Sequence, residues 1–295
     1  MVKVAIGLWG VPAWTKGDLA AIVELARTAE AAGIDSINAG DHLAMSPDGL
    51  DKYPYGKFRS TADEPFLEPL TMLAALAATT TRIRLGTTVL LAPLRPALFL
   101  AKQVATLDVI SGGRVDLGVG AGWQKEEFDA SGAPWEGRFG YLDEQIKACR
   151  TLWRDAPASF HGKWINFDRL HAKPFPLQPG GVPIWFGVPP TERGLRRISE
   201  LGDGWLPMEP DPAVLAGQIA DLRSRMAALG RDPASLRVMG RPWPAEPDLD
   251  ASLDQIPAFV AAGCDTVVFS PFRFLQAGLD FATIVDRIGA ARDRA

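Results

Sequence analysis

The sequence is poor in residues that build disulfide or metal frameworks: it has two cysteines, Cys149 and Cys264, and three histidines, His42, His161 and His171. The cysteines lie far apart in apolar contexts and no histidine pair has H-x-x-x-H spacing, which argues against a disulfide or zinc site. Acidic and basic residues are interspersed, with a net charge of −4. This balance argues against a nucleic-acid or anionic-membrane partner.

Long apolar runs are also lacking. No stretch approaches the length of a membrane-spanning helix, and the N-terminal segment MVKVAIGLWG is a predicted strand, too short for a signal peptide. We therefore expect a cytoplasmic protein without a membrane or nucleic-acid partner.

The most informative segment is 107–123, LDVISGGRVDLGVGAGW. An apolar helix ends at Gly112, because glycine tolerates the left-handed turn that closes a helix. A buried strand, 114–119, then leads into the glycines 118, 120 and 122. The G-x-G-x-G spacing differs from the dinucleotide-binding fingerprint G-x-G-x-x-G. We expect these glycines to let a flat ring or a phosphate approach the backbone, and bulky side chains filling the space above Gly120 and Gly122 would argue against a redox role. The alternative is tight packing within the protein.

The same helix–strand alternation recurs along the whole chain. Alternating apolar strands and helices predict a parallel α/β architecture, and eight repeats close into a barrel with chemistry at the strand C-termini. We predict a (β/α)8 TIM barrel with insertion loops, forming a single domain over residues 1–295. The predicted strands are 2–8, 36–39, 82–89, 114–119, 183–188, 204–208, 236–240 and 265–270. Segment 45–65 is predicted to be a long insertion, and 156–181 to contain a small hairpin.

The second strand delivers Gly40, Asp41 and His42 to the predicted barrel mouth. A carboxylate beside a histidine at this position can bind a hydroxylated ligand and exchange a proton. The alternative is that Asp41 only orients His42. A metal-dependent hydrolase is poorly supported, because only Asp41 and His42 qualify as ligands at strand ends, and we predict no metal site.

Several ordered motifs resemble the bacterial luciferase-like monooxygenase superfamily, most closely its branch that uses the deazaflavin coenzyme F420. The resemblance spans almost the whole chain. It is carried by Asp41-His42 and by the segments LAALAATTTRIRLGTTVL, AKQVATLDVISGGRVDLGVGAGW, FHGKWINF, PIWFGV and LGDGWLPM.

The resemblance implies a luciferase-like barrel with a tricyclic cofactor across the strand C-termini, F420 or alternatively FMN. It implies a cis peptide between Thr88 and Val89 beside the middle ring, and His42 and Asp41 as the catalytic pair. The cofactor-binding residues that it implies are Asp41, Thr88, Val89, Gly120, Ala121, Gly122, Trp123, Gly187, Val188 and Thr191.

The sequence departs from the family pattern at two places. The phosphate site, usually Gly-Gly-Ser/Thr, is here Gly187-Val188-Pro189-Pro190-Thr191, and proline has no N–H to donate. Thr191 can still cap the following helix. Where a deazaflavin sugar dehydrogenase has glutamate directly after the glycines, this chain has Trp123. Glu126 and Glu127 follow one helical turn later, and either a pocket role or a surface role is open to them.

An aromatic substrate pocket follows from Trp123 and nearby aromatic residues, although aromatic side chains are more often core. The residues expected to line it are Trp9, Trp14 and Trp205, with Tyr53 and Tyr55.

The leading functional hypothesis is hydride transfer between F420 and a small organic substrate. One alternative is an FMN-dependent monooxygenase supplied by a partner reductase. Another is a flavin-binding or assembly protein without turnover. The resemblance also implies a homodimer.

Overall fold

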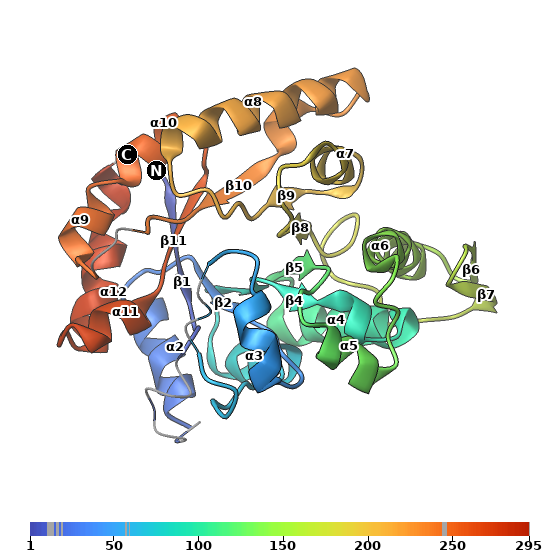
Figure 1. The fold of residues 1–295 in the computed structure, drawn as a ribbon, viewed down its shortest axis with the longest axis horizontal. Coiled ribbons are helices and arrows are strands. Elements are labelled where there is room, and N and C mark those ends of the chain that lie inside the picture. Colours follow the sequence, from blue (N-terminus) through green and yellow to red (C-terminus); the bar gives the residue numbers. More distant parts are fainter. Residues whose placement is uncertain are drawn as a thin grey trace.

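Eight parallel strands close into a barrel with helices around it, which confirms the predicted (β/α)8 fold (Figure 1). The structure is a computed structural model that describes residues 1–10, 15, 18, 20–56, 58, 60–243 and 247–294. Pairing of β1 with β11 and of β3 with β5 completes the ring. The ring consists of β1 (Lys3–Gly7), β2 (Ser36–Ala39), β3 (Arg84–Thr87), β5 (Val115–Gly120), β8 (Ile184–Phe186), β9 (Gly204–Trp205), β10 (Arg237–Gly240) and β11 (Thr266–Phe269).

The short strand β4 (Leu90–Leu91) follows β3 after an interruption and also pairs with β5. The peptide bond between Thr88 and Val89 in this interruption is cis, as the resemblance implies. From Gly86 to Leu90 the chain advances one residue more than the facing segment from Asp116 to Val119. The edge at Thr88 and Val89 is therefore a bulge at the C-terminal end of the barrel.

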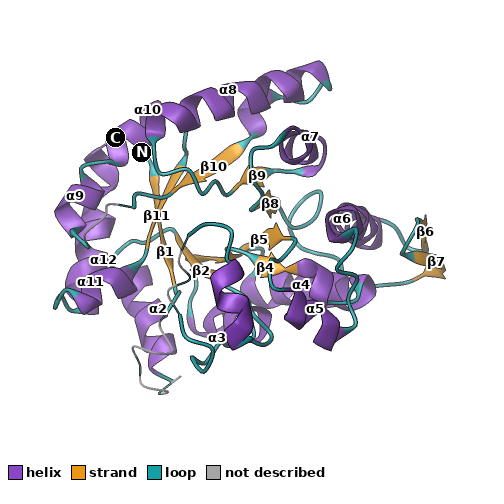
Figure 2. Cartoon of the chain, in the orientation of Figure 1, coloured by secondary structure: helices purple, strands orange, loops and turns teal. Residues whose placement is uncertain are grey.

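Helices form a layer outside the strands (Figure 2). The principal helices are α2 (Ala21–Ala31), α3 (Pro69–Thr79), α4 (Ala97–Ser111), α5 (Lys125–Ser131), α6 (Arg138–Arg154), α7 (Glu192–Leu201), α8 (Pro212–Ala228), α9 (Leu249–Leu253), α10 (Ile256–Ala261), α11 (Pro271–Gln276) and α12 (Phe281–Ala290). Short 3-10 turns are η1 (Pro47–Lys52), η2 (Ala92–Leu94), η3 (Pro233–Ser235) and η4 (Ala291–Arg294). Helix α4 ends at Gly112, whose φ of 71° is the predicted left-handed cap.

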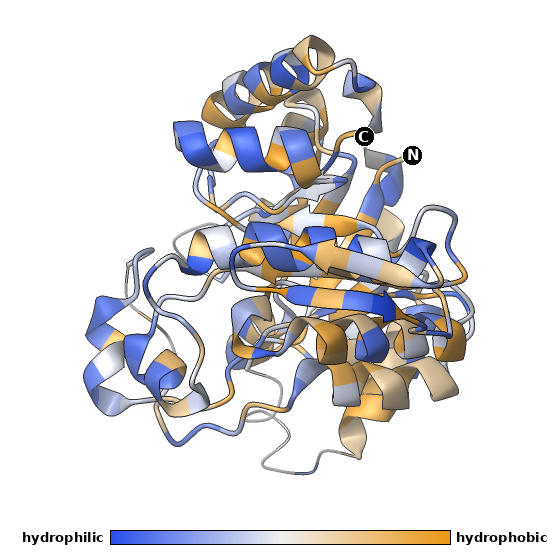
Figure 3. Ribbon diagram, turned by 90° about the vertical axis from the view of Figure 1, so that its right-hand side faces the viewer, coloured by the Kyte–Doolittle hydropathy of each residue, from blue (hydrophilic) through white to orange (hydrophobic). Residues whose placement is uncertain are grey.

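The predicted hairpin is also present, as the antiparallel pair β6 (Ala158–His161) and β7 (Asn166–Leu170). Within the described ranges, no helix has both the length and the apolar character needed to cross a membrane. Figure 3 shows hydrophilic and hydrophobic residues alternating along the helices, which is typical of helices with one face against a core.

Two cores result from the alternation of side chains along the strands. Residues such as Val4 and Ile6 point outward into the layer between barrel and helices. Ala5 points inward and packs in a separate cluster with Trp185 and Met239. Small side chains from the first strands thus face large ones from β8 and β10, so the barrel interior is filled rather than open.

Candidate active site at the C-terminal end of the barrel

His42 lies in the loop directly after β2, and its side chain is only 8% exposed. Its Nδ1 atom is 3.2 Å from Oε2 of Glu127. Three aromatic rings meet the imidazole edge-on, those of Phe58, Phe66 and Trp123, with centroid distances of 5.7, 5.2 and 5.6 Å. No group in the described part of the chain hydrogen bonds to Nε2. The imidazole thus has one nitrogen held by a carboxylate and the other available to a ligand.

Glu127 is the acidic residue that reaches the site. It lies in the first turn of α5, is 2% exposed, and accepts hydrogen bonds from the backbone amides of Leu43 and Ala44 as well as contacting His42. Its neighbour Glu126 points away and forms an ion pair with Lys52. Consecutive helical residues point about 100° apart, so only one of the two can face the barrel.

Gln124, the N-cap residue of α5, holds the same loop after His42. Sequence reasoning did not identify this residue. Its side-chain amide donates to the carbonyl of Ala44 at 2.9 Å and its carbonyl accepts from the amide of Ser46 at 3.0 Å. Together with Glu127 it ties the segment after His42 to the end of β5. The signal available in the sequence was a glutamine and a glutamate one turn apart after the glycines.

Asp41 does not pair with His42. The predicted pairing of these two residues is therefore wrong, and the carboxylate that contacts His42 is that of Glu127. The Asp41 carboxylate accepts hydrogen bonds from Arg95 at 2.7 and 3.0 Å and from the amide of Leu91 at 2.8 Å. Its side chain is fully buried. The arginine takes both oxygens in a bidentate geometry, which leaves Asp41 a structural role that ties β2 to β4.

Arg95 also contacts Glu68 at 2.8 Å, so one buried guanidinium serves two carboxylates. Burial by itself would lower the pKa of Arg95, but the hydrogen bonds and charges of Asp41 and Glu68 raise it. Burial would raise the pKa of Glu68, but its hydrogen bonds to Thr71 and Arg95 lower it. Arg95 and Glu68 are therefore both favoured in their charged forms.

The glycines at the barrel mouth make room for the protein's own side chains, and the expectation of open space above them is wrong. A Cβ at Gly120 would lie 2.6 Å from Cγ2 of Val89, and one at Gly187 would lie 2.4 Å from its Cγ1. At Gly122 the space is filled by the ring of Phe128, which would lie 2.5 Å from a Cβ added there. Val89, placed by the bulge, therefore fills the notch between β5 and β8.

Trp9 lies across the start of the mouth. Its indole N–H donates to the carbonyl of Thr88 at 3.2 Å. Its ring fits there because Gly7 and Gly40 have no side chain; a Cβ would lie 2.1 and 2.9 Å from it, respectively. The Thr88 hydroxyl is buried and has no hydrogen-bond partner among the described residues. Thr88 lines a small gap between the strands, together with Asn38, Trp185 and Met239.

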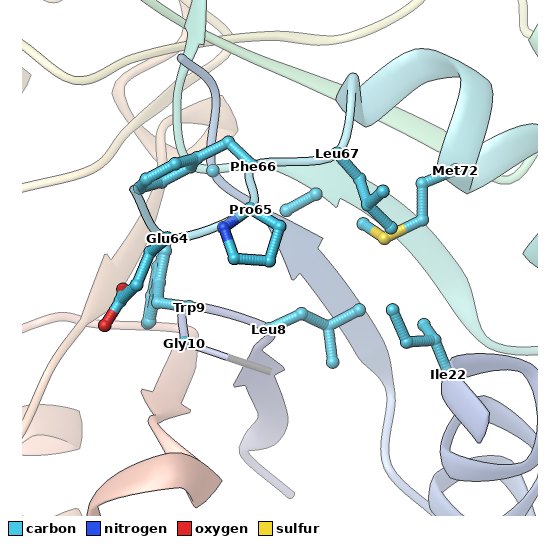
Figure 4. A pocket seen from close by; sticks show the side chains of 11 residues that line it. Leu8, Trp9, Gly10, Ile22, Glu64, Pro65, Phe66, Leu67 and Met72 are labelled. Carbon is cyan, nitrogen blue, oxygen red and sulfur yellow. The ribbon is translucent and has the colours of Figure 1, made fainter. Parts of the chain in front are cut away.

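A larger cavity of about 470 Å³, open to solvent, lies beside Trp9. Figure 4 shows Pro65 above it, with Trp9, Glu64 and Phe66 on one side. The opposite side is apolar, lined by Leu8, Ile22, Leu67 and Met72. Phe66 contacts both this cavity and His42, so the two are neighbours.

Two other tryptophans of the predicted substrate pocket have different outcomes. Trp205 is fully buried, points into the layer outside the barrel and donates to the carbonyl of Val188 at 3.2 Å. Its assignment to the pocket is therefore wrong, because its position in β9 faces the helices. Trp14 lies outside the described residues.

At the predicted phosphate site, Thr191 is the N-cap of α7 and accepts from the amide of Gly194 at 3.1 Å, so the predicted cap is confirmed. The amide of Gly187 donates to Val119 within the barrel. Arg197 turns toward α6 and pairs with Asp143 rather than facing the helix N-terminus. Fewer donors therefore face this end than a Gly-Gly-Ser/Thr sequence would supply.

Ala121 and Val188 are buried, and Trp123 forms part of the aromatic cluster around His42. No cluster of three or more histidine, cysteine, aspartate or glutamate side chains suited to a metal ion occurs in the ranges that the structure describes.

The comparisons with known proteins agree with this architecture. The family model described as luciferase-like monooxygenase matches residues 7–256. An uncharacterised protein of Mycobacterium tuberculosis is 32% identical over 269 residues, covering 90% of this chain and 91% of that protein. The chain belongs to the luciferase-like monooxygenase family, whose members are oxidoreductases and monooxygenases.

Relatives with named activities use different cofactors. The FMNH2-dependent dimethylsulfone monooxygenase of Pseudomonas putida is 34% identical over 167 residues, 55% of this chain and 45% of that protein. The coenzyme F420-dependent tetrahydromethanopterin reductase of Methanopyrus kandleri superposes with a TM-score of 0.74 at 18% identity, covering 98% of this chain and 97% of that one. The structural likeness shows the shared fold.

Proposed function

We propose that this protein transfers a hydride between the deazaflavin F420 and a small organic substrate, with His42 exchanging the accompanying proton at Nε2. The observation that carries the proposal is the buried contact of His42 Nδ1 with Glu127 at 3.2 Å. This contact fixes the ring orientation, and the aromatic residues around it exclude water from the imidazole.

The residues at the barrel mouth fit a flat, polar-edged ring. The buried Thr88 hydroxyl lacks a partner among the described residues, and the hydrogen bond of His42 within the described residues is made by Nδ1 rather than Nε2. Together with Val89 at the bulge they would hold one edge and one face of the ring. A bound deazaflavin would supply or accept the hydride, and His42, held by Glu127, would deliver or remove a proton beside it.

The remaining cofactor contacts are proposed on the family resemblance. The backbone at Ala121 and Trp123 would approach the ring edge. Val188 and Thr191 would meet the phosphate-bearing tail. The proposal also includes a homodimer and a single domain spanning the chain.

Two alternatives remain open to test. An FMN-dependent monooxygenase that receives reduced flavin from a partner reductase is favoured by the similarity to the P. putida enzyme, whose name specifies FMNH2. A flavin-binding protein without turnover is favoured by Pro189 and Pro190 at the phosphate site, because neither donates an N–H.

Cofactor titration separates these functions. The purified protein is titrated with F420 and with FMN, and binding is followed by fluorescence quenching. Tighter binding of F420 supports the proposal, and tighter binding of FMN overturns it in favour of the monooxygenase.

In turnover assays, His42→Ala should lower the rate by about 10²–10⁴-fold, as expected for loss of a general acid or base. An unchanged rate would indicate that His42 takes no part in the reaction.

A further inference from the structure

Arg241 is a cation at the barrel mouth that has no acidic partner among the described residues. It follows the last residue of β10, Gly240. Its guanidinium carbon lies 5.5 Å from the ring centroid of Trp9 and 4.7 Å from that of Trp243. Its one hydrogen bond within the described residues goes to the sulfur of Met208 at 3.1 Å, which is a weak acceptor. No described carboxylate forms an ion pair with it.

A second cation lies against the same indole. The guanidinium carbon of Arg273, in α11, is 4.2 Å from the centroid of Trp243. Burial lowers the pKa of Arg241; the nearby Tyr53 raises it, and the positive charge of Arg273 lowers it again. Two guanidinium groups therefore lie over the same indole ring.

Two buried arginines of this protein are paired with acids in salt bridges. Arg95 has Asp41 and Glu68, and Arg197 has Asp143. Arg241 is partly exposed and has no acid among the described residues, so its guanidinium can meet an anion that arrives from solvent.

The position of Arg241 relates it to the proposed reaction site through aromatic contacts. Tyr53 lies near enough to Arg241 to raise its pKa. The Tyr53 ring contacts Trp123 at 5.3 Å, and Trp123 contacts His42 at 5.6 Å. Trp9 lies beneath Arg241 and also lines the apolar cavity of about 470 Å³. Tyr53 and Trp123 thus form a chain of aromatic contacts that leads from the neighbourhood of Arg241 to His42.

From this arrangement we infer that Arg241 binds an anionic oxygen group of the substrate, a carboxylate, sulfonate or phosphate, whose apolar or aromatic body packs against Trp9 and Tyr53. A planar guanidinium beside aromatic rings suits such a group, because it donates two parallel hydrogen bonds. The identification of this ligand as the substrate rests on the proposed function. Anion binding at Arg241 itself requires no turnover. Phosphate of the cofactor is the competing source of the same chemistry.

The test compares two small probes of nearly equal shape, benzoate and benzamide, with the full-length protein in the absence of cofactor. Tryptophan fluorescence reports binding, since Trp9 and Trp243 flank Arg241. Benzoate should bind at least about tenfold more tightly than benzamide. Arg241→Gln should remove that preference without weakening benzamide binding, because only the charged benzoate loses a charge-assisted hydrogen bond.

Arg241→Lys keeps the charge but lacks the planar guanidinium, and it should retain an intermediate preference for benzoate. This variant tests the inference if Arg241→Gln does not fold. Arg27→Gln, an exposed residue paired with Glu24 on α2, is the matched control and should bind like the wild type. The inference is overturned by equal binding of the two probes, by absence of saturable benzoate binding, or by an unchanged preference in Arg241→Gln.

A further arm distinguishes the two sources of the anion. If Arg241→Gln weakens F420 or FMN binding and leaves benzoate binding unchanged, the anion belongs to the cofactor and the substrate assignment is overturned. The benzoate experiment uses neither cofactor nor turnover. Its failure would therefore leave the proposed function standing, and failure of the cofactor titration would leave the anion site standing.

Discussion

The Nδ1 atom of His42 lies 3.2 Å from Oε2 of Glu127, although 85 positions separate the two residues. The same carboxylate accepts hydrogen bonds from the backbone amides of Leu43 and Ala44. It therefore holds both the imidazole and the loop that carries it. Nδ1 faces a carboxylate, and the proton on His42 is therefore expected at Nδ1, with Nε2 as the unprotonated nitrogen.

The first prediction concerns this pair. Glu127→Gln should lower the turnover rate by about 10²-fold with little change in KM, because the imidazole loses the carboxylate that fixes its tautomer. Steady-state kinetics measures the rate, and ¹⁵N shifts of His42 report the tautomer. Glu126→Gln is the matched control, since that side chain contacts Lys52 outside the site, and it should stay within about twofold of wild type. Equal losses in the two variants would contradict a special role for Glu127.

The second prediction concerns the buried ion pair of Asp41. Asp41→Ala leaves Arg95 with fewer counter-charges in a buried site and should lower the free energy of unfolding by about 3–5 kcal/mol. Urea unfolding measures the loss. Asp129→Ala removes an exposed partner of Lys125 and should cost at most about 1 kcal/mol. A loss at Asp41 no greater than that at Asp129 would show that the pair is not a structural link.

The third prediction tests the notch filled by Val89. Gly187→Ala places a methyl group 2.4 Å from Cγ1 of Val89, which should destabilise the fold by about 1–3 kcal/mol. In a Val89→Ala background that atom is absent, and the nearest remaining atom of residue 89, Cβ, lies 3.7 Å from the added methyl. The cost of Gly187→Ala should therefore fall in the double variant, as urea unfolding of all four proteins would measure.

Gly217 provides the control for this cycle. It is an exposed glycine within α8, and nothing lies within 4 Å of an added Cβ. Gly217→Ala should stabilise the protein by about 0.5–1 kcal/mol through helix propensity alone. An equal cost of Gly187→Ala with and without Val89 would refute the steric explanation.

The fourth prediction concerns Cys149, whose thiol is fully buried between α4 and α6 and lies 3.7 Å from the carbonyl of Ala97. Burial raises the pKa of Cys149 to about 12. An unfolded cysteine ionises near pH 8.5, so the stability contributed by the neutral thiol is complete below that pH and is lost as pH rises toward 12.

Between about pH 9 and 11, the wild type should therefore lose about 1.4 kcal/mol more per pH unit than Cys149→Ala. Urea unfolding at several pH values measures the two slopes. Cys264 is the internal reference: burial also raises its pKa to about 12, and it remains in both proteins. Parallel slopes would show that Cys149 ionises equally in the folded and unfolded chains.

Much of the fold could be predicted because the pattern of neighbouring residues indicates each strand and helix. The apolar strand 114–119 and the glycine stop at Gly112 are patterns of neighbouring residues, and both appear in β5 and at the end of α4. The cis bond at Thr88–Val89 was anticipated only through the resemblance, since nothing in the residues themselves requires it.

The site was predicted less completely. Its location after β2 follows from strand order, but the partner of His42 does not. Asp41 is adjacent in sequence and was the natural candidate, yet in the structure its carboxylate is taken by Arg95. Glu127 and Arg241 reach the mouth from other strands, and their distances to His42 depend on how the barrel closes.

The sequence by itself determined a parallel barrel, because periodicity and glycine stops act over a few residues and need no distant partner. Only the tertiary structure decided that Glu127 rather than Asp41 holds His42, and that Val89 and Phe128 occupy the space beside the glycines. The physical reason is that such contacts depend on the relative positions of strand ends that are far apart in the chain, and these positions are set when the ring of strands closes.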